Sequence, residues 1–139
     1  MGLLSKIKEF FVGKPLETFK DIERDFNKLA KKYNIELIVL AGIASSIKGY
    51  PLIYSTDDEN ISRIYSAKIP QIIDLIEKFY SKSNFKELTI KYEDSQMYLE
   101  KILNNIAIFI LSDNDKNILN IKQWIDSNLQ RLISIFGSK

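Results

Sequence analysis

Two acidic clusters contain the residue types that bind metal ions. The segment 113–117 (Asp-Asn-Asp-Lys-Asn) begins like the calcium-binding loop of an EF-hand. Its sixth position is Ile118, where that loop needs glycine, and its twelfth is Trp124, where the loop needs a bidentate glutamate. The cluster 57–59 (Asp-Asp-Glu) stands just before a predicted helix, where carboxylates favour the positive end of the helix dipole. We therefore interpret both clusters as helix starts and expect no metal site.

The chain lacks the two residue types that most catalytic sites use. It has 139 residues with no His and no Cys, which excludes disulfides, thiolate metal sites, the usual zinc ligands and the Ser-His and Cys-His nucleophile pairs. The five glycines, at positions 2, 13, 42, 49 and 137, form neither a P-loop nor a dinucleotide fingerprint. We therefore expect no active site, no cofactor and no enzymatic activity.

The net charge and the length of the apolar runs limit which classes of partner this chain could bind. The net charge of +2 comes from 20 basic and 18 acidic residues spread along the chain, so no basic stripe that would follow a phosphate backbone stands out. Nucleic acid is therefore not an expected partner. The longest apolar runs, such as 106–111, are much shorter than the roughly 20 residues that span a bilayer. We expect a soluble, cytoplasmic protein with one compact domain.

Hydrophobic periodicity predicts the elements that would position any functional side chain. The first and last strands are apolar on both faces, which places them in the centre of a sheet. Pro51 opens the second strand and restricts it to an edge, because proline has no N–H to donate. Trp124 lies on the apolar stripe of the last helix, and we interpret it as core rather than as a platform for a ligand. The pattern predicts helices at 15–33, 62–82 (with Pro70 in the first turn or at a kink) and 115–136, and strands at 35–44, 52–55, 86–93, 96–102 and 106–111.

Two short motifs within this order have a known counterpart. One is the hydrophobic strand that ends in Gly49-Tyr50-Pro51-Leu52. The other is the join between the last strand and the last helix, Ile108 to Asp113 followed by Asn117-Ile118-Leu119-Asn120. From about residue 15 to the end, the chain resembles the roadblock/dynein-light-chain (Roadblock/LC7) domain family, which is related to the longin fold. Members usually have Asn-Leu-Gly at the join, so Asn117 fits and Leu119 departs from the pattern.

The resemblance implies a fold and a kind of partner. The fold would be an α+β sandwich of the form α-ββ-α-βββ-α, with a five-stranded antiparallel sheet in the order 2-1-5-4-3 and helices on both faces. Residues 15–139 would form this domain. In the family, the exposed third strands of two copies pair, and the second helices pack together on one face. The family implies a non-catalytic homodimeric scaffold that binds a small Ras-like GTPase and changes its nucleotide state or localisation.

The resemblance also implies which residues would make these contacts. Arg63, near the second helix, is the candidate contact to a GTPase, and an ordinary surface arginine is the alternative. The pattern leaves open whether the dimer-interface candidates belong instead to the core of one copy. These candidates are Leu88, Ile90, Tyr92, Ile72, Ile76 and Phe79.

Residues 1–14 precede the roadblock-like domain and are predicted to form an amphipathic helix. One face carries large apolar side chains that we expect to dock on something, because leaving them in water would forgo roughly 1.5 to 3 kcal/mol each. The docking surface is either the same domain or its dimer mate, or a partner protein or membrane surface. The last possibility gives an alternative function, a longin-type trafficking adaptor tethered through this helix and located peripherally at a membrane. The residues of this face are Leu3, Leu4, Ile7, Phe10 and Phe11.

Overall fold

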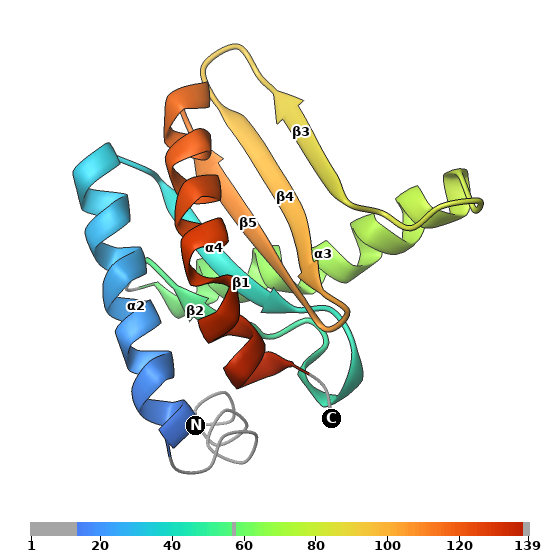
Figure 1. Cartoon of the computed structure of the whole chain (residues 1–139). Coiled ribbons are helices and arrows are strands. Elements are labelled where there is room, and N and C mark those ends of the chain that lie inside the picture. Colours follow the sequence, from blue (N-terminus) through green and yellow to red (C-terminus); the bar gives the residue numbers. More distant parts are fainter. Residues whose placement is uncertain (1–13, 57, 138–139) are drawn as a thin grey trace.

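The computed structural model describes residues 14–56 and 58–137. The predicted N-terminal helix therefore lies outside the described residues, apart from its last position. The elements are labelled in Figure 1. In chain order they are α2 (Lys14–Tyr33), β1 (Leu37–Gly42), the 3-10 turn η1 (Ser45–Ile47), β2 (Pro51–Tyr54), α3 (Glu59–Phe79), β3 (Glu87–Lys91), β4 (Gln96–Leu103), β5 (Ile106–Ser112) and α4 (Asp115–Phe136).

The five strands form one antiparallel sheet in the order β2-β1-β5-β4-β3. This is the order that the resemblance implied. Helices α2 and α4 lie on one face of the sheet and α3 crosses the other (Figure 1). We call these the α2/α4 face and the α3 face. Every residue of β1 and β5 is buried, which confirms that both strands are central and covered on two sides.

Strand β2 forms one edge of the sheet, as Pro51 predicted. The turn before it depends on Gly49, whose φ of 83° is in the left-handed region that glycine enters without steric cost. The β1–β2 connection therefore has the geometry that its Gly-Tyr-Pro sequence favours.

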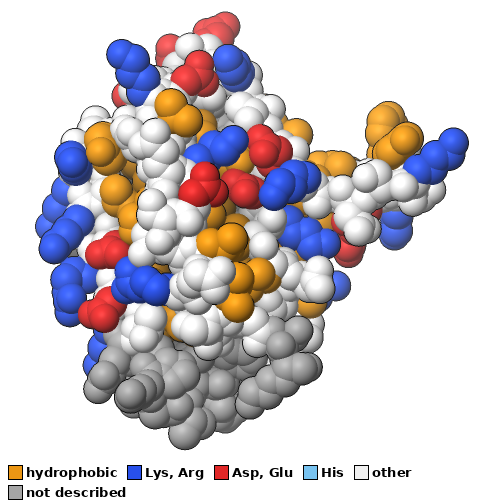
Figure 2. Space-filling model, viewed as in Figure 1, with side chains coloured by type: hydrophobic (Ala, Val, Ile, Leu, Met, Phe, Trp, Pro, Cys, Tyr) orange, Lys and Arg blue, Asp and Glu red, His pale blue; other side chains and the backbone are white. Residues whose placement is uncertain are grey.

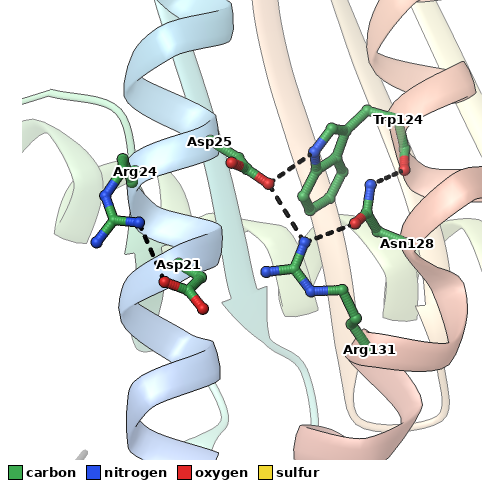
Figure 3. Close-up of polar contacts among 6 residues, drawn as sticks. All are labelled: Asp21, Arg24, Asp25, Trp124, Asn128 and Arg131. Atoms are coloured by element: carbon green, nitrogen blue, oxygen red, sulfur yellow. Dashed lines mark hydrogen bonds and ion pairs between the residues drawn. The ribbon is translucent and has the colours of Figure 1, made fainter.

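A polar contact joins α2 to α4 over their apolar packing (Figure 3). The Asp25 carboxylate accepts hydrogen bonds from Nε1 of Trp124 at 3.2 Å and from the Arg131 guanidinium at 3.3 Å. The Trp124 ring also meets Phe26 edge-on, with centroids 5.3 Å apart. Trp124 is therefore partly buried and packs against the core, as predicted, and its polar edge has a partner on the neighbouring helix.

Helix α3 begins three residues earlier than predicted because Asp58 caps it. The Asp58 side chain accepts hydrogen bonds from the backbone N–H groups of Asn60 and Ile61, at 3.0 and 3.3 Å. This confirms that the acidic cluster starts a helix, although Asp57 itself is outside the described residues. The earlier start places Pro70 in the helix interior and not in the first turn, and there it donates no hydrogen bond to the carbonyl of Ser66.

The second acidic segment also starts a helix. The Asn114 side chain accepts a hydrogen bond from the backbone N–H of Asn117 at 3.0 Å, which caps α4. The side chain of Asn117 is buried and donates to Oγ of Ser112 at 2.9 Å and to the Asp113 carboxylate at 3.3 Å. Asn117 thus fixes the join between β5 and α4.

Candidate interaction surface

Strand β3 presents a free edge. In the part of the chain that the structure describes, β3 pairs on one side only, with β4. Four of its five residues are exposed, and Ile90 and Tyr92 keep 38% and 54% of their surface in contact with solvent. A strand edge with unpaired N–H and C=O groups and exposed apolar side chains is a template for another strand.

The last turns of α3 project beyond this edge as an arm, which we define as residues 74–80 (Figure 1). Its largest apolar side chains are strongly exposed: Leu75 at 70%, Phe79 at 91% and Tyr80 at 60%. Figure 2 shows hydrophobic side chains at the tip of the arm. Single exposed apolar residues are common on protein surfaces, but several together on a projecting helix end indicate a contact surface.

The base of the arm is anchored to the start of β3. The Glu77 carboxylate accepts a hydrogen bond from the backbone N–H of Phe85 at 2.9 Å, and it lies 3.8 Å from Nζ of Lys101 on β4. Phe85 is itself buried against the α3 face. The arm therefore leaves the sheet at the end of β3 where that strand begins.

The six interface candidates divide into two groups. Ile72, Ile76 and Leu88 are partly buried and pack on the hydrophobic cluster of the α3 face, so they contribute to the core of one copy. Phe79, Ile90 and Tyr92 are exposed at the arm and the free edge. Periodicity could not separate the groups, because both satisfy the same spacing.

A cavity of about 340 Å³ opens on the α3 face beside the first half of α3. Ile61 and Ile64 form its outer wall and are substantially exposed, while Leu37 and Leu111 lie on its sheet side. Tyr65 also lines it, with its ring stacked on Phe109 at a centroid distance of 5.0 Å. We call this cavity the hollow; its lining residues are Glu36, Leu37, Thr56, Ile61, Ile64, Tyr65, Lys68 and Leu111.

Sequence reasoning missed both the hollow and half of the arm. Ile61, Ile64, Leu75 and Tyr80 were not among its candidates. A signal was present, since Ile61 and Ile64 are three residues apart, Leu75 and Phe79 are four apart, and both pairs lie off the inner stripe that contains Ile69 and Ile73. Apolar residues outside the stripe that the sheet buries are candidates for a contact surface.

Arg63 is on α3 near the hollow and is about half exposed. Its guanidinium makes an ion pair with Glu59 one turn earlier, with an N–O distance of 2.6 Å. The pair is on the surface, where such contacts contribute little to stability. The side chain is therefore open to a partner, but already has a local acidic neighbour.

The largest pKa shift among the described residues is at Tyr98, which lies on the α2/α4 face of β4 opposite Thr89 of β3. Burial, together with the hydrogen bond to the Glu100 carboxylate at 2.6 Å, raises the pKa of Tyr98 well above its usual value. Burial and the nearby Glu59 carboxylate likewise raise the pKa of Tyr54. Both shifts keep a phenol neutral, which suits a structural role.

Within residues 14–56 and 58–137, no group of three or more acidic side chains is placed to hold a metal ion. Across the same residues, no helix has the length and apolar character needed to cross a bilayer. The candidate contacts Leu3, Leu4, Ile7, Phe10 and Phe11 lie outside the described residues.

Comparisons with known proteins give a likeness in structure rather than in sequence. No protein-family model matches the chain, and no curated protein matches it. Among solved structures, Myxococcus xanthus MglB is 14% identical, with a TM-score of 0.67 over 91% of this chain and 92% of that one. The gliding protein MglB from Thermus thermophilus is 12% identical, with a TM-score of 0.65 over 90% and 93%.

A third solved structure carries the family name itself. The Roadblock/LC7 domain from Streptomyces avermitilis is 11% identical, with a TM-score of 0.64 over 80% of this chain and 97% of that one. Identities this low establish the fold alone. The strand order 2-1-5-4-3, the three described helices and these matches together show that the chain has the Roadblock/LC7 fold.

Proposed function

We propose that this protein is a non-catalytic homodimeric scaffold that binds a small Ras-like GTPase and changes its nucleotide state or localisation. The observation that carries the proposal is the free β3 edge, which lies beside an exposed apolar arm. The fold supports it, because the roadblock resemblance implies such a platform. The absence of His and Cys from the sequence favours a binding role over catalysis.

The dimer would form by antiparallel pairing of two β3 strands into one continuous sheet. Alternate residues of β3, whose N–H and C=O groups point away from β4, would gain hydrogen-bond partners, and Ile90 and Tyr92 would lose solvent exposure. The two α3 helices would then lie on the same face of the joined sheet. Leu88, Ile72 and Ile76 would support this interface from beneath, because they are packed partly into the core.

The GTPase would bind the joined platform, with Arg63 as one contact. In the free protein Arg63 is paired to Glu59, so binding to an acidic or phosphate-bearing partner would exchange one anionic neighbour for another. An arginine can donate two parallel N–H groups to such a partner, and a lysine cannot. We therefore expect Arg63→Lys to weaken binding nearly as much as Arg63→Ala.

The test is a pull-down of purified full-length protein with the small GTPases of the same genome, each loaded with GDP or a GTP analogue. We expect at least one GTPase to bind, with a preference for one nucleotide state, because a regulator must distinguish the two. Leu119→Ala, a substitution of an exposed apolar residue on α4, is the matched control for Arg63→Ala. Binding to no GTPase in either state would overturn the proposal.

The alternative function is a longin-type adaptor tethered to a membrane or a partner helix through residues 1–14. The observation in its favour is the apolar set Leu3, Leu4, Ile7, Phe10 and Phe11 between lysines. In this alternative the protein is cytoplasmic and peripheral at a membrane.

Flotation of the full chain and of a chain lacking residues 1–14 with anionic liposomes tests the membrane tether. Loss of lipid binding with the shorter chain supports the tether, and no binding by either chain removes it.

A further inference from the structure

Helix α3 carries two separate apolar features on the α3 face: the hollow near its start and the arm at its end. Ile64 in the wall of the hollow and Phe79 on the arm are fifteen residues apart, or about 22 Å along the helix. One molecule therefore cannot place its own Phe79 in its own hollow. The hollow is open, and the arm projects past the sheet edge.

The strand register fixes where the hollow lies along the sheet. Leu37 pairs with Leu111, Leu111 pairs with Met97, and Met97 pairs with Ile90. These four residues form a row across the α3 face, from the hollow to the end of β3 where that strand finishes. The arm is anchored at the other end of β3, by Glu77 to Phe85 and Lys101. Arm and hollow are thus on one face but at opposite ends of the strands.

In a dimer with paired β3 strands, a two-fold axis between the two strands, level with the middle of each, exchanges these ends. Thr89 is the central residue of the strand, and antiparallel pairing about it relates two copies by rotation about an axis perpendicular to the sheet. The rotation keeps both α3 helices on one face. It carries the arm of one copy to the level of the Ile90–Met97–Leu111–Leu37 row of the other, and toward the hollow at the end of that row.

We propose that the hollow of each copy receives the arm of the second copy, with Phe79 as the inserted side chain. The inference rests on the homodimer of the proposed function and specifies how that dimer is closed. Paired edges of five residues are small compared with the roughly 20 to 30 residues a side of a stable interface. The arm and the hollow supply additional apolar surface. The two-fold symmetry makes this contact twice, once with the arm of each copy.

Disulfide trapping tests the contact directly, because the natural chain has no cysteine. The variant carries Phe79→Cys and Ile64→Cys, both at exposed positions, so the fold should be unaffected. A disulfide requires Cα atoms about 4.4 to 6.8 Å apart, so the two cysteines of one helix cannot react with each other. We expect mild oxidation to convert most of the protein into a covalent dimer that reductant reverses.

The matched control pairs Phe79→Cys with Ser127→Cys, an exposed position on α4 at the α2/α4 face, and we expect it to cross-link at least tenfold less. Light scattering of the unoxidised variants measures the dimer independently. A dimeric mass without selective cross-linking overturns the insertion of Phe79 and leaves the homodimer standing. A monomeric mass at every concentration overturns the homodimer of the proposed function and the insertion with it.

Discussion

Asp25 and Trp124 are 99 residues apart in the sequence, and a hydrogen bond of 3.2 Å from the indole Nε1 to the carboxylate joins their helices. The same carboxylate accepts from Arg131. This contact is the polar edge of the α2–α4 packing (Figure 3). It lies on the α2/α4 face, so it is independent of the proposed contact on the α3 face.

Trp124→Phe should lower the free energy of unfolding by about 0.5 to 1.5 kcal/mol, because it removes one hydrogen bond and keeps an aromatic ring against Phe26. Urea unfolding measures the change. Asp25→Ala and the double variant complete a thermodynamic cycle. If the two single effects add to within about 0.3 kcal/mol, the side chains are not coupled and the hydrogen bond contributes nothing.

Ile90→Lys should separate the two copies without unfolding either. Ile90 is 38% exposed at the free edge, so the monomer should lose no more than about 0.5 kcal/mol of stability. A lysine there would place two like charges near the two-fold axis of the dimer, and a charged edge resists strand pairing. Light scattering should show half the wild-type mass. Leu119→Lys, at an exposed residue of α4, should leave the dimer intact, and equal masses for both variants would contradict the edge-pairing model.

Phe79→Asp should weaken the dimer about tenfold or more, since burying a phenylalanine contributes roughly 1.5 to 3 kcal/mol. In the free monomer the residue is 91% exposed, so the unfolding curve of the monomer should not move. Sedimentation at several concentrations gives the dissociation constant. Leu119→Asp is the control for adding a negative charge; if it weakens the dimer equally, the loss is a general charge effect and Phe79 makes no specific contact.

Tyr98 should make the protein sensitive to alkali. Its phenol would ionise near pH 10.0 in the unfolded chain, while burial and the Glu100 hydrogen bond raise its pKa in the native state. The raised pKa means that the neutral Tyr98 phenol stabilises the native state. This stabilisation is fully present below pH 10 and is lost as pH rises above it, because the unfolded state releases a proton that the native state retains.

Tyr98→Phe should therefore be less stable than wild type at pH 7, and the gap should narrow from pH 10 upward. Urea unfolding of both proteins between pH 7 and pH 11 measures the gap. A gap that stays constant across this range would show that Tyr98 ionises alike in the native and unfolded states.

The sheet could be predicted from the sequence because single residues constrained it. Strands β1 and β5 carry apolar residues on both faces, so they had to be central, and Pro51 could stand only at an edge. The alternation in 86–93 correctly indicated a strand, but four of the five residues of β3 are exposed, so both of its faces meet solvent. These features are local, and each has one physical interpretation.

The arm and the hollow could not be predicted in the same way. An apolar residue at helical spacing buries its side chain only if something lies beneath it, and spacing does not tell where the sheet ends. Ile76 therefore packs on the α3 face while Phe79, one turn later, meets solvent. The hollow brings Glu36 and Thr56 from connecting segments to Ile64 on α3, and side chains from such segments meet only in three dimensions.

Strand β2 has a consequence for how far association through strand edges can proceed. Two copies joined at β3 would make a sheet of twice five strands with β2 at both outer ends. That strand has four residues and begins with Pro51, which offers no N–H to an incoming chain. Edge-to-edge growth would therefore stop after one pairing step. The short β2 strand with Pro51 at its start would prevent the sheet from elongating into a fibre.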